Sequence, residues 1–336
     1  MPLVRRNIVT HEMSRKKFGE GMKRLKLDFS AGVTTEALGF PGPSFPVSAY
    51  DQFVVWHSVA MDTLTPPDST NPRARNAAHR GSVFLPWHRF MLLLLERHLQ
   101  RVLEDTTFAL PYWDWAVDGD HQPTSEQRNL PLWQDTGIGG SGSPVTNGPF
   151  QFDRDHPEQS FRVFFSEDAV SGRLVPLFEG RGLARQLARS GSAPALPTTQ
   201  QVTALLEDED LVYDTAEWDS ASPGFRNTLE GWIPPPPAQP GLHNRVHVWV
   251  GGDMAPGTSP NDPAFFLHHC NVDRIWEAWM VNRGRTYLPA DDTAGAPIGH
   301  RLSDKIQSLV TTRTTTPAEM LDVTHLYTYD ALPATS

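Results

Sequence analysis

The sequence predicts a mainly α-helical protein with a four-helix bundle core, long irregular loops and little β structure. Two observations support this prediction. Four segments place apolar residues at the three- and four-residue spacings of a helix face, not at the alternating spacing of a strand. The stretches between them are rich in glycine, proline, serine and aspartate, which favour turns and loops. With 336 residues and a hydrophobic fraction of 39%, the chain is long and apolar enough to bury a core.

The four helix-face stripes follow one another along the chain. They are Phe53, His57, Met61 and Leu64; His88, Leu92, Leu95, Leu99 and Val102; His243, His247 and Val250; and Phe265, His269, Val272, Trp276 and Trp279. We expect His79 in a loop or at a helix start, and His88 in the first turn of the helix that contains Phe90.

The remaining segments are expected to be irregular. Residues 117–222 should pack over the helices as loops, and the proline run at 233–240 should be an extended connector. No shift in composition marks a flexible linker, so we expect residues 1–336 to form a single domain.

Composition and charge exclude several classes of function. Lys and Arg number 29 against 39 Asp and Glu, and the net charge of −10 argues against binding to nucleic acid or to anionic membranes. The basic N-terminus is not followed by an apolar segment, so neither a signal peptide nor a membrane span is expected. A cytoplasmic location is therefore expected, and export with a partner protein stays open. Cys270 is the single cysteine, so no disulfide can form within the chain.

Each of the four stripes contains a histidine. If the stripes face one core, the imidazoles converge there, and each buried ring has two nitrogens that need partners. A metal ion accepts one nitrogen per ring, and bundle cores are common places for such sites. His243 and His247 lie one turn apart, so they can bind one ion together. Imidazole suits zinc, copper, iron and nickel alike, but the absence of a carboxylate from the set favours oxygen chemistry over hydrolysis.

Longer motifs carry a family resemblance. They are HRGSVFLPWHRF (79–90), LPYWDW (110–115), GFRNTLEGW (224–232), LHNRVHVWVGGDM (242–254), SPNDPAFFLHHCNVDRIWEAW (259–279) and LYTYD (326–330). With these motifs the chain resembles bacterial tyrosinases, in the type 3 copper family that also holds catechol oxidases and hemocyanins. The resemblance covers nearly the whole chain. It implies a dinuclear centre of two copper ions with O2 as co-substrate.

The resemblance also implies roles for individual residues. The first copper site matches His57, His79 and His88, and the second matches His243, His247 and His269. Spacing alone does not decide between His268 and His269; the family's ligand is the second of the pair, which leaves His268 as a neighbour of the ligands. Glu230 and Asn244 match a pair that holds a water near the second copper and is expected to act in catalysis.

Further residues are expected around this site. The substrate pocket should be lined by Val248, Pro256, Ser259 and Phe265. Asp273 should orient a ligand ring, and Cys270 should be a packed residue rather than a ligand. Arg5 or Arg6 should stack on Tyr327 or Tyr329 of the closing motif. The shielding domain that follows the core in many family members is not expected in this chain.

The expected activity is that of a dicopper oxidase. It would hydroxylate monophenols at the ortho position, oxidise o-diphenols to o-quinones, or do both. The alternatives are a catechol or o-aminophenol oxidase without monophenol activity, and, from another class, an oxygen carrier like hemocyanin. A zinc-binding structural bundle is a third class. The expected partners are a small phenol and O2, with a copper-loading helper protein as a further candidate.

Overall fold

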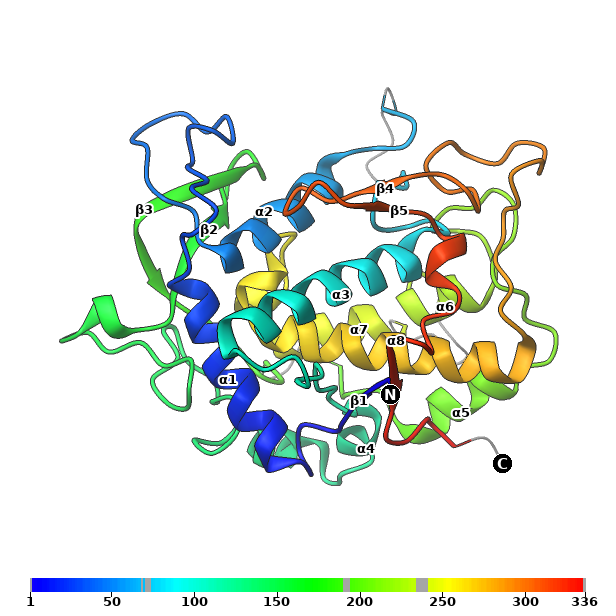
Figure 1. Cartoon of the computed structure of the whole chain (residues 1–336). Coiled ribbons are helices and arrows are strands. Elements are labelled where there is room, and N and C mark those ends of the chain that lie inside the picture. Colours follow the sequence, from blue (N-terminus) through cyan, green and yellow to red (C-terminus); the bar gives the residue numbers. More distant parts are fainter. Residues whose placement is uncertain (1, 68, 70–73, 190–193, 234–240, 335–336) are drawn as a thin grey trace.

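The computed structural model describes residues 2–67, 69, 74–189, 194–233 and 241–334. Helices dominate this part of the chain, and the few strands are short, so the mainly α prediction is confirmed (Figure 1). The helices are α1 (Glu12–Lys26), α2 (Ala49–Asp62), α3 (Phe84–Leu103), α4 (Trp115–Gly119), α5 (Thr199–Glu207), α6 (Phe225–Glu230), α7 (Leu242–Val250) and α8 (Ala264–Arg283). The strands are β1 (Leu3–Arg5), β2 (Arg162–Glu167), β3 (Leu174–Gly182), β4 (Ile306–Gln307), β5 (Thr314–Thr315) and β6 (Tyr327–Tyr329). Of the connector predicted at 233–240, residues 234–240 lie outside the described residues.

The four predicted stripes lie in α2, α3, α7 and α8, except that Leu64 of the first stripe lies beyond the end of α2 at Asp62. Helix α3 packs against α8 in the middle of the molecule, while α1 covers α3, and α7 packs against α8 (Figure 1). Helix α2 reaches the same core through its side chains, since the ring of Trp56 lies 4.8 Å from that of Trp87 on α3. The four-helix core that holds the histidines is thus present as predicted.

Helix α8 is buried on all its faces from Ala264 to Met280, because neighbouring elements surround it. The carboxylate of Asp262 accepts the N–H of Ala264 at 2.9 Å and so satisfies one of the free donors at the helix start. The helix ends at Gly284, whose φ of +83° suits a residue without Cβ.

Helix α3 begins earlier than expected. It starts at Phe84, so His88 lies one full turn inside the helix and not in its first turn. Pro86 falls in the first turn, where a missing N–H costs nothing because that donor has no helical partner. Pro86 is therefore compatible with a helix that begins two residues before it, at Phe84.

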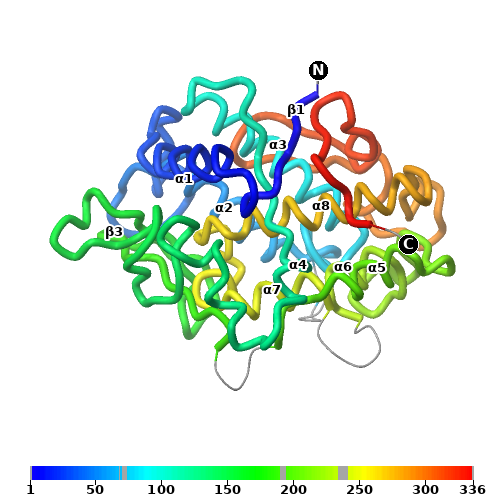
Figure 2. The backbone as a smooth tube through the Cα atoms, turned by 90° about the horizontal axis from the view of Figure 1, so that it is seen from below, coloured from blue at the N-terminus to red at the C-terminus, as the bar shows by residue number. Residues whose placement is uncertain are grey.

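In the described part of the chain the strands form three separate two-stranded sheets. β2 and β3 make an antiparallel hairpin with an irregularity between Val163 and Phe165. This hairpin and α5 lie inside the segment 117–222, which was expected to be irregular throughout. β4 pairs with β5, and β1 pairs in parallel with β6, so the N-terminal strand runs beside the C-terminal segment (Figure 2).

The β1–β6 pair is fastened by a buried arginine. Arg5 is fully buried, and its guanidinium carbon lies 3.4 Å from the ring centroid of Tyr327, which confirms the predicted cation–π contact. Its side chain also bonds Glu96 on α3 at 3.1 Å and Asp273 on α8 at 3.3 Å. The two ends of the described chain are therefore tied to both central helices.

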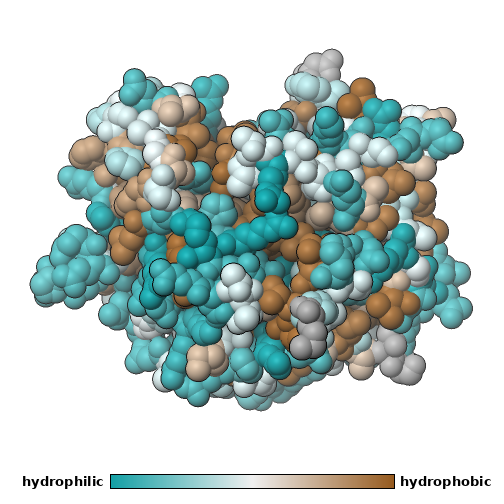
Figure 3. All heavy atoms as spheres, in the orientation of Figure 1, coloured by the Kyte–Doolittle hydropathy of each residue, from teal (hydrophilic) through white to brown (hydrophobic). Residues whose placement is uncertain are grey.

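The surface carries polar and apolar side chains side by side. Figure 3 shows polar side chains spread over one face and apolar ones gathered in the hollow between its two upper lobes. Among the described residues, no helix combines the length and the apolar character that crossing a bilayer requires.

Candidate metal centre

The structure gathers the predicted histidines into two groups, which are buried except for His247, a partly exposed residue. His57 comes from α2, His79 from the loop before α3, and His88 from α3. The second group takes two rings from α7 and two from α8: His243, His247, His268 and His269. Within each group, the possible donor atoms all lie within 4.8 Å of one another.

The two groups face each other across the core. The ring of His88 stacks on that of His269, with centroids 4.1 Å apart and an angle of 10° between the planes. The ring of Phe84 lies 4.8 Å from His88 and 4.9 Å from His243, so it touches both groups. The site is therefore one continuous cluster of rings, contributed by all four helices and one loop.

Backbone carbonyls orient four of the rings. A carbonyl oxygen only accepts hydrogen bonds, so the Nδ1 facing it carries the proton and Nε2 is left with a free electron pair. Such bonds are the usual way in which proteins fix a metal-binding histidine. They join Nδ1 of His57 to Gly257 O at 2.6 Å, His88 to Phe84 O at 2.8 Å, His243 to Glu230 O at 3.1 Å, and His247 to Met254 O at 2.7 Å.

The electron pairs directed inward lack hydrogen-bond donors. Nε2 of His57 and Nε2 of His88 have no hydrogen-bond partner among the described residues. Nε2 of His243 lies 3.0 Å from Nε2 of His247, although both rings already carry their proton on Nδ1. Two electron pairs at this distance repel unless a cation lies between them. A metal ion with nitrogen ligands at about 2.0–2.1 Å holds neighbouring ligands about 3.4 Å apart, so these residues fit one.

Burial keeps the rings neutral, which is the form that binds metal. It lowers the pKa of His57 to about 3 and that of His247 to about 4, although the hydrogen bonds to Gly257 and Met254 partly oppose this. Burial likewise holds the pKa values of His79 and His88 well below the ordinary value. Both groups consist of histidine alone, so the described donor set brings no negative charge to offset bound cations.

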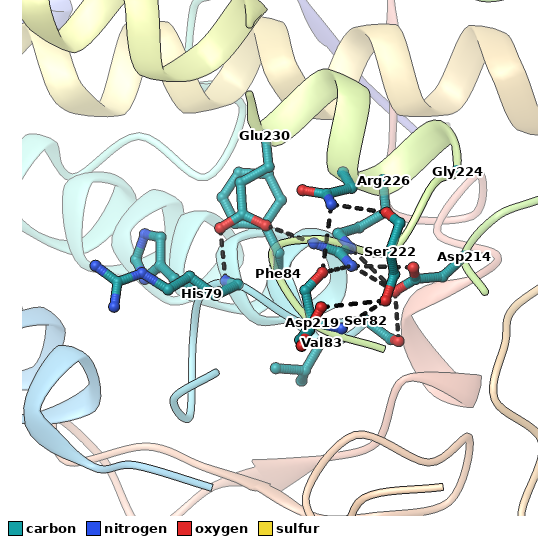
Figure 4. Close-up of polar contacts among 12 residues, drawn as sticks. His79, Ser82, Val83, Phe84, Asp214, Asp219, Ser222, Gly224, Arg226 and Glu230 are labelled. Atoms are coloured by element: carbon teal, nitrogen blue, oxygen red, sulfur yellow. Dashed lines mark hydrogen bonds and ion pairs between the residues drawn. The ribbon is translucent and has the colours of Figure 1, made fainter. Parts of the chain in front are cut away.

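Glu230, at the end of α6, connects the two groups. Its Oε1 accepts the backbone N–H of Arg80, the residue after His79, at 2.7 Å (Figure 4). Its backbone carbonyl accepts Nδ1 of His243. Its Oε2 accepts a hydrogen bond from Arg226 at 3.0 Å. The carboxylate is fully buried, and burial raises its pKa despite the opposing charge of Arg226.

The sequence did not reveal the network behind Glu230. Arg226 is fully buried and forms ion pairs with both Glu230 and Asp214, and Asp214 also accepts the hydroxyl of Ser82 at 2.7 Å (Figure 4). Arg226 and Glu230 lie four residues apart, a spacing at which oppositely charged side chains on a helix can pair, so the sequence does contain a signal for this ion pair. Asp214 and Ser82 come from loops, so no spacing in the sequence joins them to the site.

Asn244 and Val248 lie on the same side of α7. Oδ1 of Asn244 is 3.0 Å from Nδ1 of His243, so it shares that proton with the carbonyl of Glu230. Asn244 is partly exposed, and Val248, one turn further on, is 47% exposed. Asn244 thus joins the second histidine group to the surface, and Val248 is exposed on the same side of the helix.

The other expected pocket residues differ in exposure. Phe265 is fully buried, and its ring packs 5.0 Å from His57 and 4.2 Å from His269, so it forms an inner wall of the cluster. Ser259 is also buried and closes a turn by donating its N–H to the carbonyl of Pro256 at 2.9 Å. Pro256 is partly exposed.

Glu167, a residue that the sequence did not indicate, supports the loop that orients His57. Its carboxylate, at the end of β2, accepts the backbone N–H groups of Gly257 and Thr258. The carbonyl of Gly257 is the one that holds Nδ1 of His57. The β2–β3 hairpin, itself unpredicted, thereby supports the first histidine group.

The structure gives Asp273 a role other than the expected one. Its carboxylate accepts hydrogen bonds from Arg89 at 2.5 Å and from Tyr327 at 2.6 Å, and also from Tyr329. Nδ1 of His269 has no hydrogen-bond partner among the described residues. One helical turn places Asp273 below His269, but two arginines and two tyrosines from β1, α3 and β6 occupy its oxygens.

Cys270 is packed away from the histidines. It is fully buried, and its Sγ lies 3.7 Å from the carbonyl of Leu110 and 3.8 Å from the hydroxyl of Tyr329. Burial raises its pKa to about 12, so it is a neutral thiol at neutral pH.

Comparison with known proteins places this cluster in a family. A family model described as the common central domain of tyrosinase matches residues 47–282. A tyrosinase of Streptomyces lincolnensis is 39% identical over 295 residues, which cover 85% of this chain and 91% of the relative. A grixazone synthase of Streptomyces griseus is 36% identical over 299 residues, which cover 84% of this chain and 90% of the relative.

Solved structures share the fold. A variant polyphenol oxidase from Thermothelomyces thermophila superposes with a TM-score of 0.66 at 21% identity, over 98% of this chain and 88% of that one. The two histidine groups are consistent with a dinuclear type 3 copper site, as the sequence predicted. The chain therefore belongs to the tyrosinase family and is a tyrosinase-like copper oxidoreductase.

Proposed function

We propose that the protein uses O2 to hydroxylate monophenols at the ortho position and to oxidise o-diphenols to o-quinones. The observation that supports this most is the pair of facing histidine groups, whose carbonyl-oriented rings direct neutral Nε2 atoms into one buried space. In our assignment His57, His79 and His88 hold one copper ion, and His243, His247 and His269 hold the other. Bound copper supplies the electron transfer that couples O2 reduction to phenol oxidation.

The chain's own residues position the phenol and accept its proton. A free phenol has a pKa of about 10, so its hydroxyl needs a base near neutral pH. We assign this role to a water held between the carboxylate of Glu230 and Oδ1 of Asn244. The two carboxylate oxygens of Glu230 accept three hydrogen bonds, from the backbone of Arg80 and from the side chains of Arg226 and Trp232, which leaves one electron pair for that water. Asn244 and Val248 line the approach, and Phe265 forms the apolar wall.

The overall reactions balance with O2 alone. A monophenol and one O2 give an o-quinone and one water, while two o-diphenols and one O2 give two o-quinones and two waters. Because a tyrosinase and a grixazone synthase are both more than 30% identical to this chain, family membership does not fix the substrate. Oxidation of catechols or of o-aminophenols without monophenol activity is therefore the second candidate.

The test compares three substrates on copper-loaded protein. Oxygen uptake is measured with tyrosine, a catechol and an o-aminophenol. We expect turnover of tyrosine and of the catechol; turnover of the catechol or o-aminophenol alone selects the second candidate. Reversible oxygen binding without any turnover contradicts the proposal and indicates a carrier like hemocyanin. Binding of zinc to the exclusion of copper contradicts it as well and indicates a structural zinc bundle.

The base is tested by Glu230→Gln. The amide keeps an oxygen to accept the N–H of Arg80 but removes the charge that polarises the water. We expect the rate on tyrosine to fall by about 10²-fold, within the range of one general base, and the rate on a catechol to fall less. Glu319→Gln, a surface replacement of the same type, serves as the control. Full tyrosine activity with normal copper content would remove Glu230 from this role.

A further inference from the structure

His268 is a buried histidine whose two ring nitrogens both lack a partner in the described part of the chain. A buried polar atom left without a hydrogen bond costs about 1–3 kcal/mol, so such atoms are rare and usually have a reason. Four of the neighbouring histidines avoid this cost by bonding Nδ1 to a backbone carbonyl. His268 therefore does not behave as an ordinary core histidine.

The ring of His268 lies inside the second histidine group. It stacks on His243 with centroids 4.9 Å apart and 23° between the planes, and its edge meets His247 at 5.0 Å. One of its nitrogens lies within 4.8 Å of the donor nitrogens of His243, His247 and His269. Two ligands on opposite sides of one ion lie about 4.2 Å apart when each bond is about 2.1 Å long. At most one of the other three donors can lie opposite His268, and ligands at a tetrahedral angle lie about 3.4 Å apart, so a shift of up to about 1.4 Å would bring His268 within bonding distance of the same ion.

Helix geometry explains how two adjacent residues reach one site. Successive residues on α8 point about 100° apart, so His268 and His269 diverge from the helix. Helix α7 packs against α8, and the ring of His243 lies 4.9 Å from His268 and 4.8 Å from His269. The pair His243 and His247 is therefore reached by both imidazoles of α8.

We propose that His268 is a metal-binding residue of the second site, a fourth nitrogen donor that holds the ion when His269 does not. It takes copper during loading and passes it to His269, so that the ion is never held by fewer than three nitrogens. This inference rests on the copper assignment made above for His243, His247 and His269. It also accounts for one of the two unpartnered nitrogens of a ring that lies beside three ligands.

Phenylalanine variants test the proposal without removing the ring. His268→Phe keeps the stacking on His243, and His269→Phe keeps the packing on His88 and Phe265, while both lose their nitrogens. Copper per chain is measured by atomic absorption after anaerobic loading with Cu(I) and gel filtration, and the rate of loading is followed by transfer from a coloured Cu(I) chelator. His98→Phe, which changes a histidine outside both groups, is the matched control, and circular dichroism checks the fold.

We expect two copper ions per chain in the unchanged protein, in the His98→Phe control and in His269→Phe. In His269→Phe, one of the two sites should bind copper about 10- to 100-fold more weakly. The double variant should bind one, and His268→Phe should bind two but load several-fold more slowly. Equal copper content in His269→Phe and in the double variant overturns the proposal, as does a normal loading rate for His268→Phe. Fewer than two copper ions in the unchanged protein instead overturns the copper assignment and, with it, this inference.

Discussion

Replacing Asp273 with asparagine tests the buried ionic network that ties β1 and β6 to the two central helices. Asp273 is 3% exposed and accepts hydrogen bonds from Arg5, Arg89, Tyr327 and Tyr329. The amide removes its negative charge and leaves two arginines, both fully buried, with less compensation. Breaking a buried ion pair in this way costs about 3–5 kcal/mol.

This cost converts into a shift of the melting temperature. The entropy of unfolding is about 2.1 cal/mol/K per residue, or about 0.7 kcal/mol/K for 336 residues, so Tm should fall by about 4–7 °C. Differential scanning calorimetry of the copper-free protein measures the shift. The control is Glu20→Gln, which breaks an exposed pair with Arg24 and should change stability by less than about 0.5 kcal/mol. A Tm for Asp273→Asn within 1 °C of the unchanged protein would refute the reasoning.

The same variant has a predicted pH dependence. Burial raises the pKa of Asp273, but the charges of Arg89 and Arg5 outweigh it, and the folded pKa lies below the ordinary value. A carboxylate of this kind stabilises the fold above its unfolded pKa of about 4, and this contribution disappears as the pH falls through the folded value. The difference in stability between the two proteins should therefore be constant near pH 7 and shrink in acid.

Three further predictions concern other parts of the molecule. Burial raises the pKa of Asp118 to about 6, so the contribution of this carboxyl to the free energy of unfolding falls as the pH rises from about 4 to 6. Over that range, urea unfolding should show Asp118→Asn becoming about 2–3 kcal/mol more stable relative to the unchanged protein. A difference between the two proteins that does not change with pH would contradict this prediction. A Cβ added at Gly81 would meet the ring of His300 at 2.5 Å, so Gly81→Ala should lower the free energy of unfolding in urea by about 1–3 kcal/mol. In the double variant, His300→Ala should relieve part of that cost. Effects of the two substitutions that simply add would argue against the clash. Glu167→Ala should weaken copper binding at the site of His57 about 10- to 100-fold, measured by Cu(I) competition titration. Glu167→Gln keeps a hydrogen-bond acceptor for the loop and should not weaken it. Equal copper affinities for the two variants would contradict the role of Glu167 in supporting the loop that orients His57.

Part of this structure could be predicted because its signal is local. The spacing of His243 and His247 within one stripe identifies both a helix and the face that it buries, and the same is true of the stripes through His57 and Phe265. Boundaries were less certain, as the start of α3 shows: Pro86 is compatible with the first turn of a helix and also with a residue before one.

Other parts depend on contacts between distant residues. Asp214 meets Ser82 across 132 positions, and Glu167 meets Gly257 across 90, so no periodicity connects them. The β2–β3 hairpin escaped prediction because Phe164 and Phe165 are adjacent and apolar, which breaks the alternation that marks a strand. The environment of Asp273 was missed for the same reason, since its partners come from both ends of the described chain.

The carbonyl contacts of His57, His88, His243 and His247 have a consequence for how this protein can vary. Their acceptors are main-chain oxygens, which every amino acid possesses. Exchanging the side chains of Phe84 or Met254 leaves those oxygens in place, provided that the backbone keeps its path. Ring orientation is thus inherited from the course of the polypeptide, which gives directed evolution freedom to alter the surroundings of the catalytic centre.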